Sequence, residues 1–163
     1  MTWAPLLIAV TKVKGNVDID IEYQKGLKSL AGLLPRLEEV GMHFNIMSNG
    51  NLESIDGAFP SLRKVGGSIT IRSNTDLKSL AGGFPALTSV VGNGISIYQN
   101  NQLTSVGTGV NTRDNQVFAS LAPNSIKTLT FHTNGASQYG HSLAFFGALN
   151  RSSLMRVSTG GSR

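Results

Sequence analysis

A motif that returns at intervals of about 25 residues constrains the fold of this chain more than any other feature. In each copy a Leu-x-Ser-(Leu/Ile) segment is followed by (Phe/Leu)-Pro-x-Leu and, three residues later, by a valine. The copies span residues 27–40, 52–65 and 77–90. Tandem repeats of this length form solenoids, in which each unit buries its apolar side chains against its neighbours. The sequence therefore predicts a stack of similar coils.

A short segment with alternating apolar residues follows a glycine-marked turn in each repeat. Apolar side chains two positions apart lie on one side of a β-strand, so each segment presents one face to a core. The segments are Val17–Ile21, Phe44–Ile46, Ile69–Ile71, Ile95–Ile97 and Leu129–Phe131. We predict an all-β, β-helical solenoid of about five coils, the fifth less regular than the others. Glycines such as Gly41, Gly66, Gly67 and Gly92 are expected to mark turns with positive φ.

The domain organisation follows from the repeat. The chain has 163 residues, enough to bury one core, and we predict a single domain over residues 1–157. Regular coils cover about 13–107, an irregular insertion about 108–118, and the last coil with its cap about 119–157. Apolar spacings of three and four in the cap are compatible with a short helix that covers the open end of the stack. Residues 158–163 are predicted to form a disordered tail.

Composition excludes several classes of protein. There is no cysteine, so neither disulfides nor thiolate metal sites contribute. The net charge is +5, but the basic residues are scattered and not interleaved with stacking aromatics, which argues against nucleic acid. No stretch approaches the roughly 20 apolar residues of a membrane span. The apolar run in residues 1–10 lacks a basic segment before it, so we interpret it as a partial coil and not as a signal peptide.

A polar residue recurs three positions after the second apolar residue of each strand. A short amide at a corner can bond backbone groups in its own and neighbouring coils, where buried polar groups need partners. Stacked along the axis, these side chains would form a structural ladder and not a binding site. The ladder residues are Gln24, Asn49, Asn74, Asn100 and Asn134.

The full motif, Gly-x-Ile-x-Ile-x-x-Asn-x-x-Leu-x-Ser-Leu-x-x-Phe-Pro-x-Leu-x-x-Val, resembles the receptor L-domain repeat, a relative of leucine-rich repeats. It is similar also to repeats of fungal cell-wall and protist surface proteins. The resemblance covers about 13–107 and resumes around 126–134. It implies a right-handed β-helix, ligand recognition on a sheet face or by the loops, and an extracellular or cell-surface location. The absence of cysteine favours the protist or fungal surface-protein type, because disulfide-rich modules border the animal receptor domains.

Outward-facing side chains of the predicted strands form two columns along the sheet. One column is polar and consists of Asp20, Asn45, Thr70, Ser96 and Thr130. The other mixes an acid, a thioether, a guanidinium, a phenol and an imidazole: Glu22, Met47, Arg72, Tyr98 and His132. Such a mixture suits recognition of a protein or glycan, with Arg72 and Tyr98 as anchors. The competing interpretation is a variable solvent-exposed face without a partner.

Catalytic and metal-binding chemistry has little support in the sequence. Asp18, Asp20 and Glu22 alternate along the first strand, and such a row could bind calcium or act in acid–base chemistry. Alternating carboxylates also protect sheet edges. The histidines lack metal-ligand spacing, and no nucleophile, phosphate-binding or dinucleotide motif is present. We therefore predict no enzyme activity, no metal and no cofactor.

Three hypotheses about function remain open. The main one is a non-enzymatic recognition module that binds a protein or glycan through the outward face of the main sheet. The alternative is a structural spacer or cell-surface scaffold segment of a longer repeat protein. A binder of ice or of a glycan surface is the third, although ice binding would require a more regular threonine ladder than the polar column offers.

Overall fold

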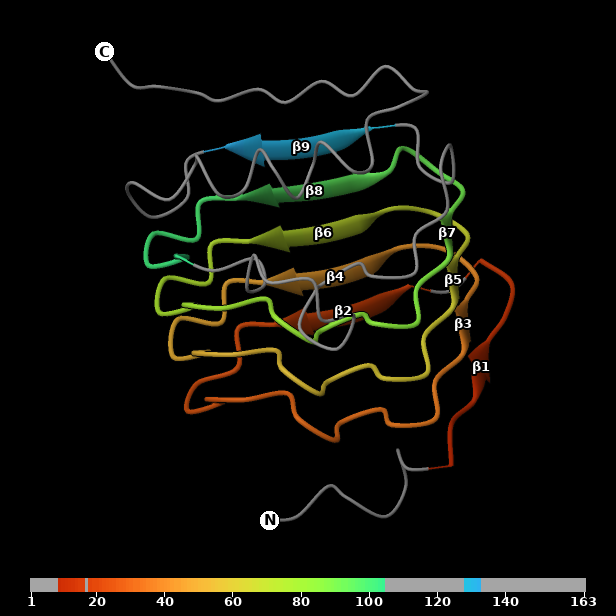
Figure 1. The fold of residues 1–163 in the computed structure, drawn as a ribbon, viewed down its shortest axis with the longest axis horizontal. Coiled ribbons are helices and arrows are strands. Elements are labelled where there is room, and N and C mark those ends of the chain that lie inside the picture. Colours follow the sequence, from red (N-terminus) through yellow and green to blue (C-terminus); the bar gives the residue numbers. More distant parts are fainter. Residues whose placement is uncertain (1–8, 17, 105–127, 133–163) are drawn as a thin grey trace.

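The computed structural model describes residues 9–16, 18–104 and 128–132. Within these residues the chain is all-β, with parallel strands, no helix and about three turns of a β-solenoid (Figure 1). The predicted class of fold is confirmed. The remaining expectations concern residues outside the described part: the insertion at 108–118, the helical cap and the tail at 158–163. Of the expected fifth coil, the structure describes only the strand at 129–132 and the residue before it.

The larger sheet contains the strands that the alternating segments predict. Its order is β2-β4-β6-β8-β9, and all pairs are parallel. The strands are β2 (Ile19–Glu22), β4 (Phe44–Met47), β6 (Ile69–Arg72), β8 (Ile95–Tyr98) and β9 (Leu129–His132). The first residues of the five strands are register partners in sequence order, so the repeat spacing predicts the pairing correctly. Each strand ends one residue later than the alternation indicates.

A second, smaller sheet forms another side of the coil. Its order is β1-β3-β5-β7, and each strand has two residues: β1 (Lys12–Val13), β3 (Glu39–Val40), β5 (Lys64–Val65) and β7 (Ser89–Val90). Two residues are too few for alternation to be visible, so the sequence pattern identifies only an apolar side there. The repeated valines Val40, Val65 and Val90 are in register and fully buried.

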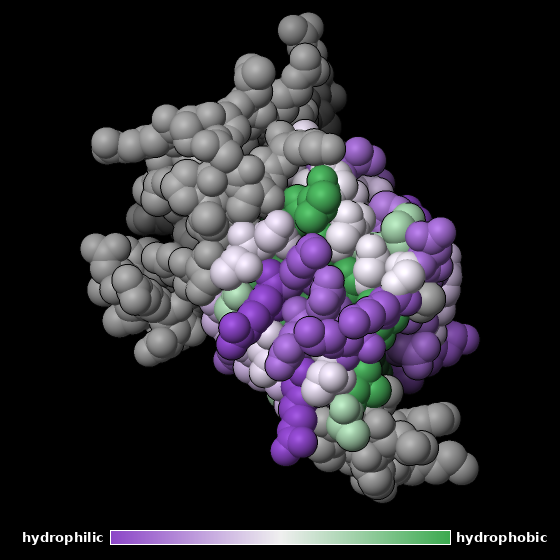
Figure 2. Space-filling view, turned by 90° about the vertical axis from the view of Figure 1, so that its right-hand side faces the viewer, coloured by the Kyte–Doolittle hydropathy of each residue, from purple (hydrophilic) through white to green (hydrophobic). Residues whose placement is uncertain are grey.

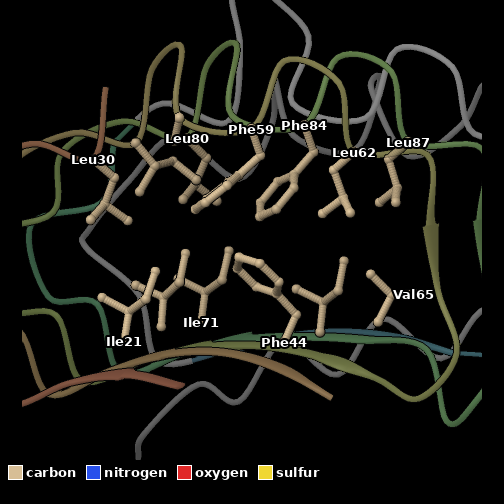
Figure 3. Packing of buried hydrophobic residues seen from close by; sticks show 14 of the residues in the cluster. Ile21, Leu30, Phe44, Phe59, Leu62, Val65, Ile71, Leu80, Phe84 and Leu87 are labelled. Carbon is tan, nitrogen blue, oxygen red and sulfur yellow. The ribbon is translucent and has the colours of Figure 1, made fainter. Parts of the chain in front are cut away.

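The core lies between the two sheets and the repeated leucine-containing segments (Figure 3). Phe59 and Phe84, from the Phe-Pro motifs, stack with ring centroids 5.1 Å apart. Phe44 from β4 packs edge-on against Phe59, with a centroid distance of 4.7 Å. Burying a large apolar side chain contributes about 1.5–3 kcal/mol, and in a solenoid that burial needs a neighbouring coil. At the first coil, Ile19 is only partly buried.

Four glycines have a role that differs from the expected one. The expectation of positive φ at Gly41, Gly66, Gly67 and Gly92 is wrong, because none of the four has it. A Cβ at any of them would instead lie within 3.0 Å of backbone atoms of the preceding coil. At Gly92 the distance to the carbonyl oxygen of Gly67 would be 2.6 Å. These glycines are therefore required because adjacent coils approach each other too closely for a side chain.

Candidate functional site

The mixed column lies along the outward face of the larger sheet, as its alternation predicts. Glu22, Met47, Arg72 and Tyr98 are successive register partners, and all four are half-buried. The backbone of His132 continues the row opposite Tyr98. Because neighbouring parallel strands are about 4.8 Å apart, the row places different functional groups at regular intervals along the sheet.

Contacts within the outward face join neighbouring coils. The Nδ2 of Asn45 donates to the Oδ1 of Asp20 at 2.7 Å, and the Nε of Arg72 lies 2.9 Å from the Sδ of Met47. The Met47 contact directs one edge of the guanidinium along the sheet. The column is thus a row of separate groups and not a convergent cluster, which suits an extended contact better than attack on one bond.

The asparagine ladder holds three coils together behind this face. Asn49, Asn74 and Asn100 are fully buried. The Oδ1 of Asn74 accepts from the backbone N–H of Asn49 at 3.1 Å, and its Nδ2 donates to the carbonyl of Ile46 at 3.0 Å. The Oδ1 of Asn100 accepts from the N–H of Asn74 at 3.1 Å in the same way. These side chains therefore satisfy backbone groups that would otherwise be buried without partners.

The first coil departs from the ladder. The backbone N–H of Gln24 donates to the Oδ1 of Asn49 at 3.0 Å, but the Gln24 side chain is exposed. Its Nε2 donates to the carbonyl of Glu22, two residues earlier, at 2.7 Å. Gln24 is thus a ladder member only through its backbone. Asn134 lies outside the described residues.

A left-handed residue precedes each ladder position. Tyr23, Ser48, Ser73 and Gln99 have φ between 52° and 57°, although none is glycine. This conformation follows the strand, and at Ser48, Ser73 and Gln99 the next side chain is a buried ladder asparagine. Non-glycine residues in this region are uncommon and carry a local energetic cost. Sequence reasoning missed the feature, because three different residue types occupy this backbone conformation at the four positions.

Another column of side chains, which accept hydrogen bonds from backbone N–H groups of the next coil, lies just before the strands of the larger sheet. The Oδ1 of Asp18 accepts from the N–H of His43 at 2.8 Å. The Nδ1 of His43 accepts from the N–H of Ser68 at 3.1 Å, and the Oγ of Ser68 accepts from the N–H of Asn93 at 3.1 Å. Asp18 and His43 are therefore engaged in coil-to-coil bonding. Because three different residue types occupy this position, the sequence repeat does not reveal the bonding role that they share.

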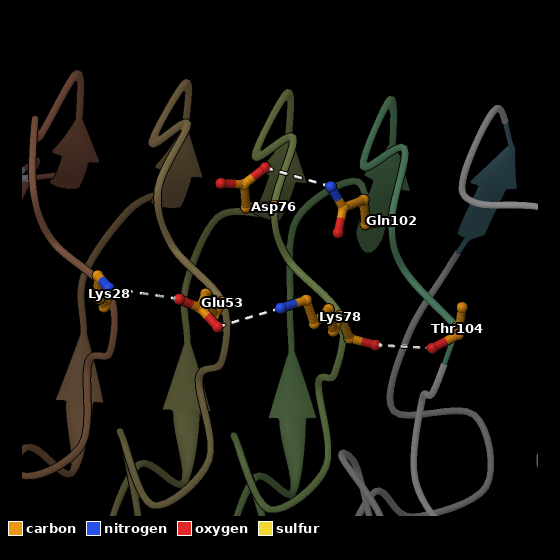
Figure 4. A network of polar contacts seen from close by, with 6 residues as sticks. All are labelled: Lys28, Glu53, Asp76, Lys78, Gln102 and Thr104. Atoms are coloured by element: carbon orange, nitrogen blue, oxygen red, sulfur yellow. Dashed lines mark hydrogen bonds and ion pairs between the residues drawn. The ribbon is translucent and has the colours of Figure 1, made fainter.

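Alternating charges form a ladder on the side with the leucine-containing segments (Figure 4). Glu53 lies between Lys28 and Lys78, with N–O distances of 3.9 and 3.1 Å. The hydrogen bond from Lys78, its charge and then the charge of Lys28 lower the pKa of the Glu53 carboxyl below its ordinary value. Beyond Lys78, the Oγ1 of Thr104 donates to the Lys78 carbonyl at 3.4 Å.

We expect Lys78→Met to raise the pKa of Glu53 toward its ordinary value. A carboxyl whose folded-state pKa is lowered stabilises the fold above its unfolded-state pKa, and that contribution is lost as the pH falls through the folded-state pKa. The variant should show a smaller pH dependence, because Lys28 still lies near the carboxylate. An NMR titration of the Glu53 carboxyl carbon measures the shift. Lys64→Met, which removes a lysine paired with Glu39 at 3.3 Å, is the control and should leave Glu53 unchanged. Identical Glu53 titrations in wild type and Lys78→Met would contradict the assignment.

The smaller sheet presents a different surface. Figure 2 shows mostly hydrophilic side chains on this side of the molecule, interrupted by a few apolar ones. Lys12, Glu39 and Lys64 alternate in sign in the register of β1, β3 and β5. Val91, 50% exposed, follows β7. Lys12 pairs with Glu38 at 3.9 Å and Lys64 with Glu39 at 3.3 Å, and exposed ion pairs of this kind contribute little to stability.

Metal chemistry has no structural support in the described ranges. Among residues 9–16, 18–104 and 128–132, no group of three His, Asp or Glu side chains could hold a metal ion. The described part of the chain also contains no helix that is long and apolar enough to cross a membrane. Asp18 and Asp20, two of the alternating carboxylates, each accept a hydrogen bond from the second coil.

Comparison with known proteins provides no relative on which to base a function. No protein-family model, curated protein or solved structure matches the chain. The resemblance to receptor L-domain repeats therefore depends on the motif residues alone.

Proposed function

We propose that this chain is a non-enzymatic recognition module that binds a protein or glycan through the outward face of the larger sheet. One contrast carries the proposal. The inward positions of β4, β6 and β8 hold only Phe and Ile, whereas their last outward positions hold Met47, Arg72 and Tyr98. A repeat that keeps its core uniform and changes its outward chemistry from coil to coil is typical of solenoids that use a sheet face for binding.

The chemistry of the face suits such a partner. Arginine and tyrosine are enriched among the residues that dominate binding energy at interfaces, and they are adjacent here as register partners. Glu22, Met47 and the backbone position of His132 extend the row on either side. The resemblance to receptor L domains supports the same use of the face and a location outside the cell or on its surface. No cofactor is required for this activity.

We expect Arg72→Ala/Tyr98→Ala to abolish partner binding without loss of the fold. Removing two interface anchors typically costs at least about 2 kcal/mol each, which weakens binding about 10³-fold in total. The measurement is a glycan array and a capture experiment with surface proteins, using the intact chain and the variant, each with circular dichroism as a check on folding. Arg63→Ala/Tyr23→Ala is the matched control, because both side chains are exposed and lie outside the column. A partner that binds the Arg72/Tyr98 variant as tightly as wild type would refute the proposal.

A scaffold segment is the second candidate, and a specific observation favours it. Ladders of amide, capping and charged side chains join successive coils, so the stack can in principle be extended by further units. In this alternative the chain is part of a longer repeat protein and its outward face has no partner. The arrays should then yield no ligand for wild type, and Arg72→Ala/Tyr98→Ala should be indistinguishable from it.

A further inference from the structure

The N-terminal edge of the larger sheet carries a side-chain cap on its backbone. Alternate residues of a parallel strand direct their backbone groups to opposite neighbours. The carbonyl of Met47 accepts from the N–H of Tyr23 in the preceding coil at 3.3 Å, and Arg72 does the same for Ser48 at 3.1 Å. Glu22 is the register partner of Met47, so its carbonyl faces away from the second coil. In the described part of the chain, β2 has a strand on one side only.

Gln24 occupies the position of the missing donor. Its Nε2 donates to the Glu22 carbonyl at 2.7 Å, whereas Asn49 and Asn74 donate to carbonyls of the preceding coil. Asn100 shows that a ladder asparagine can reach both kinds of acceptor, because its Nδ2 donates to Ile71 of the preceding coil and to Tyr98, two residues earlier, each at 3.1 Å. The Gln24 amide makes the second kind of bond, to a carbonyl that faces away from the second coil. It therefore satisfies an edge carbonyl that an incoming strand would use.

Charge adds a second barrier at the same edge. Asp18 and Asp20 are exposed beside the half-buried Glu22. A twofold pair of chains joined along β2 would bring these carboxylates of one copy against the same carboxylates of the other. Like charges directly opposite one another destabilise strand pairing, and charged side chains on an edge strand are a known protection against edge-to-edge association.

We propose that Gln24, Asp20 and Glu22 close the N-terminal sheet edge against pairing with a second copy of this chain. The first strand of the described sheet then has a backbone acceptor already bonded and a negatively charged flank. This inference is independent of the proposed recognition function, because it concerns a different set of bonds and its test requires no ligand.

The test is sedimentation velocity of the full chain over a range of concentrations. Asp20→Asn/Glu22→Gln/Gln24→Ala removes the cap and two charges while keeping an oxygen at residue 20 for Asn45. We expect this variant to self-associate at least about tenfold more tightly than wild type, a change equivalent to about 1.4 kcal/mol. Glu38→Gln/Asp56→Asn/Gln102→Ala makes the same three types of change away from the edge and should behave like wild type.

A lysine version separates edge pairing from other causes of association. Asp20→Lys/Glu22→Lys/Gln24→Ala also lacks the cap but restores like charges along the edge, so it should not self-associate more than wild type. Equal association of the lysine and neutral variants would overturn the proposal, as would a neutral variant that sediments like wild type. If the neutral triple variant does not fold, Gln24→Ala alone provides the comparison, with weaker association expected in the same direction and none if the proposal is wrong.

Discussion

Replacing Asn74 with alanine is expected to lower the free energy of unfolding by about 3–5 kcal/mol. The side chain is fully buried, and its loss removes the acceptor of the Asn49 N–H and the donor to the Ile46 carbonyl. It also removes the donor to the Oδ1 of Asn100, 3.2 Å away. Each buried polar group left without a partner costs about 1–3 kcal/mol. For a chain of this size the midpoint of thermal unfolding should fall by about 10 °C.

The control for this prediction is Asn51→Ala. Asn51 is also an asparagine and lies two residues after the ladder residue Asn49, but its side chain is exposed. Its replacement should therefore change the free energy of unfolding by less than about 0.5 kcal/mol. Denaturant unfolding followed by circular dichroism measures both variants. A loss at Asn74 no larger than that at Asn51 would mean that the ladder does not stabilise the stack.

The second large effect is expected at Gly66. A Cβ there would overlap the carbonyl oxygen of Gly41, and this obstacle is backbone, which cannot move without separating two coils. The N–H of Gly66 also donates to the carbonyl of Val40 at 2.8 Å, so a displacement weakens the pairing of β3 with β5. We expect Gly66→Ala to destabilise the fold by about 3 kcal/mol, the upper end of the usual range for overpacking.

Gly50→Ala is the matched control for Gly66. Gly50 has no positive φ, and a Cβ there would approach only the Oγ1 of Thr75, at an ordinary 3.6 Å. Its replacement should be neutral or slightly stabilising, because alanine restricts the unfolded chain more than glycine does. Thermal unfolding of the two variants side by side decides the matter. Similar midpoints would show that the coils are not packed as closely as the structure indicates.

The sequence predicts the larger sheet well because its signal is local and repeated. Alternation marks β4, β6 and β8, and spacings of 25 and 26 residues place Phe44, Ile69 and Ile95 opposite one another. The same alternation assigns the outward columns. The smaller sheet could not be predicted, because a two-residue strand such as Lys64–Val65 is too short to show alternation of apolar and polar residues.

Other features depend on distances between coils, which a single repeat does not encode. The glycines illustrate this. A positive φ and a close approach between coils both require glycine, so the residue type at Gly66 does not show which of the two is the cause. Gln24 shows the converse. Its place in the pattern predicts a ladder residue, and only the structure shows that its side chain is exposed and that its amide donates to Glu22. Likewise, register places Arg72 beside Met47, but the contact between their side chains also depends on rotamers, which the repeat pattern does not give.

We propose that a uniform core supports a recognition face on the larger sheet, and NMR chemical-shift mapping of the backbone amides with a ligand recovered from the arrays tests this most directly. The perturbed amides should concentrate along β2, β4, β6 and β8, with the largest changes around Arg72 and Tyr98. Perturbations confined to β3, β5 and β7, or to the turns between the sheets, would contradict it.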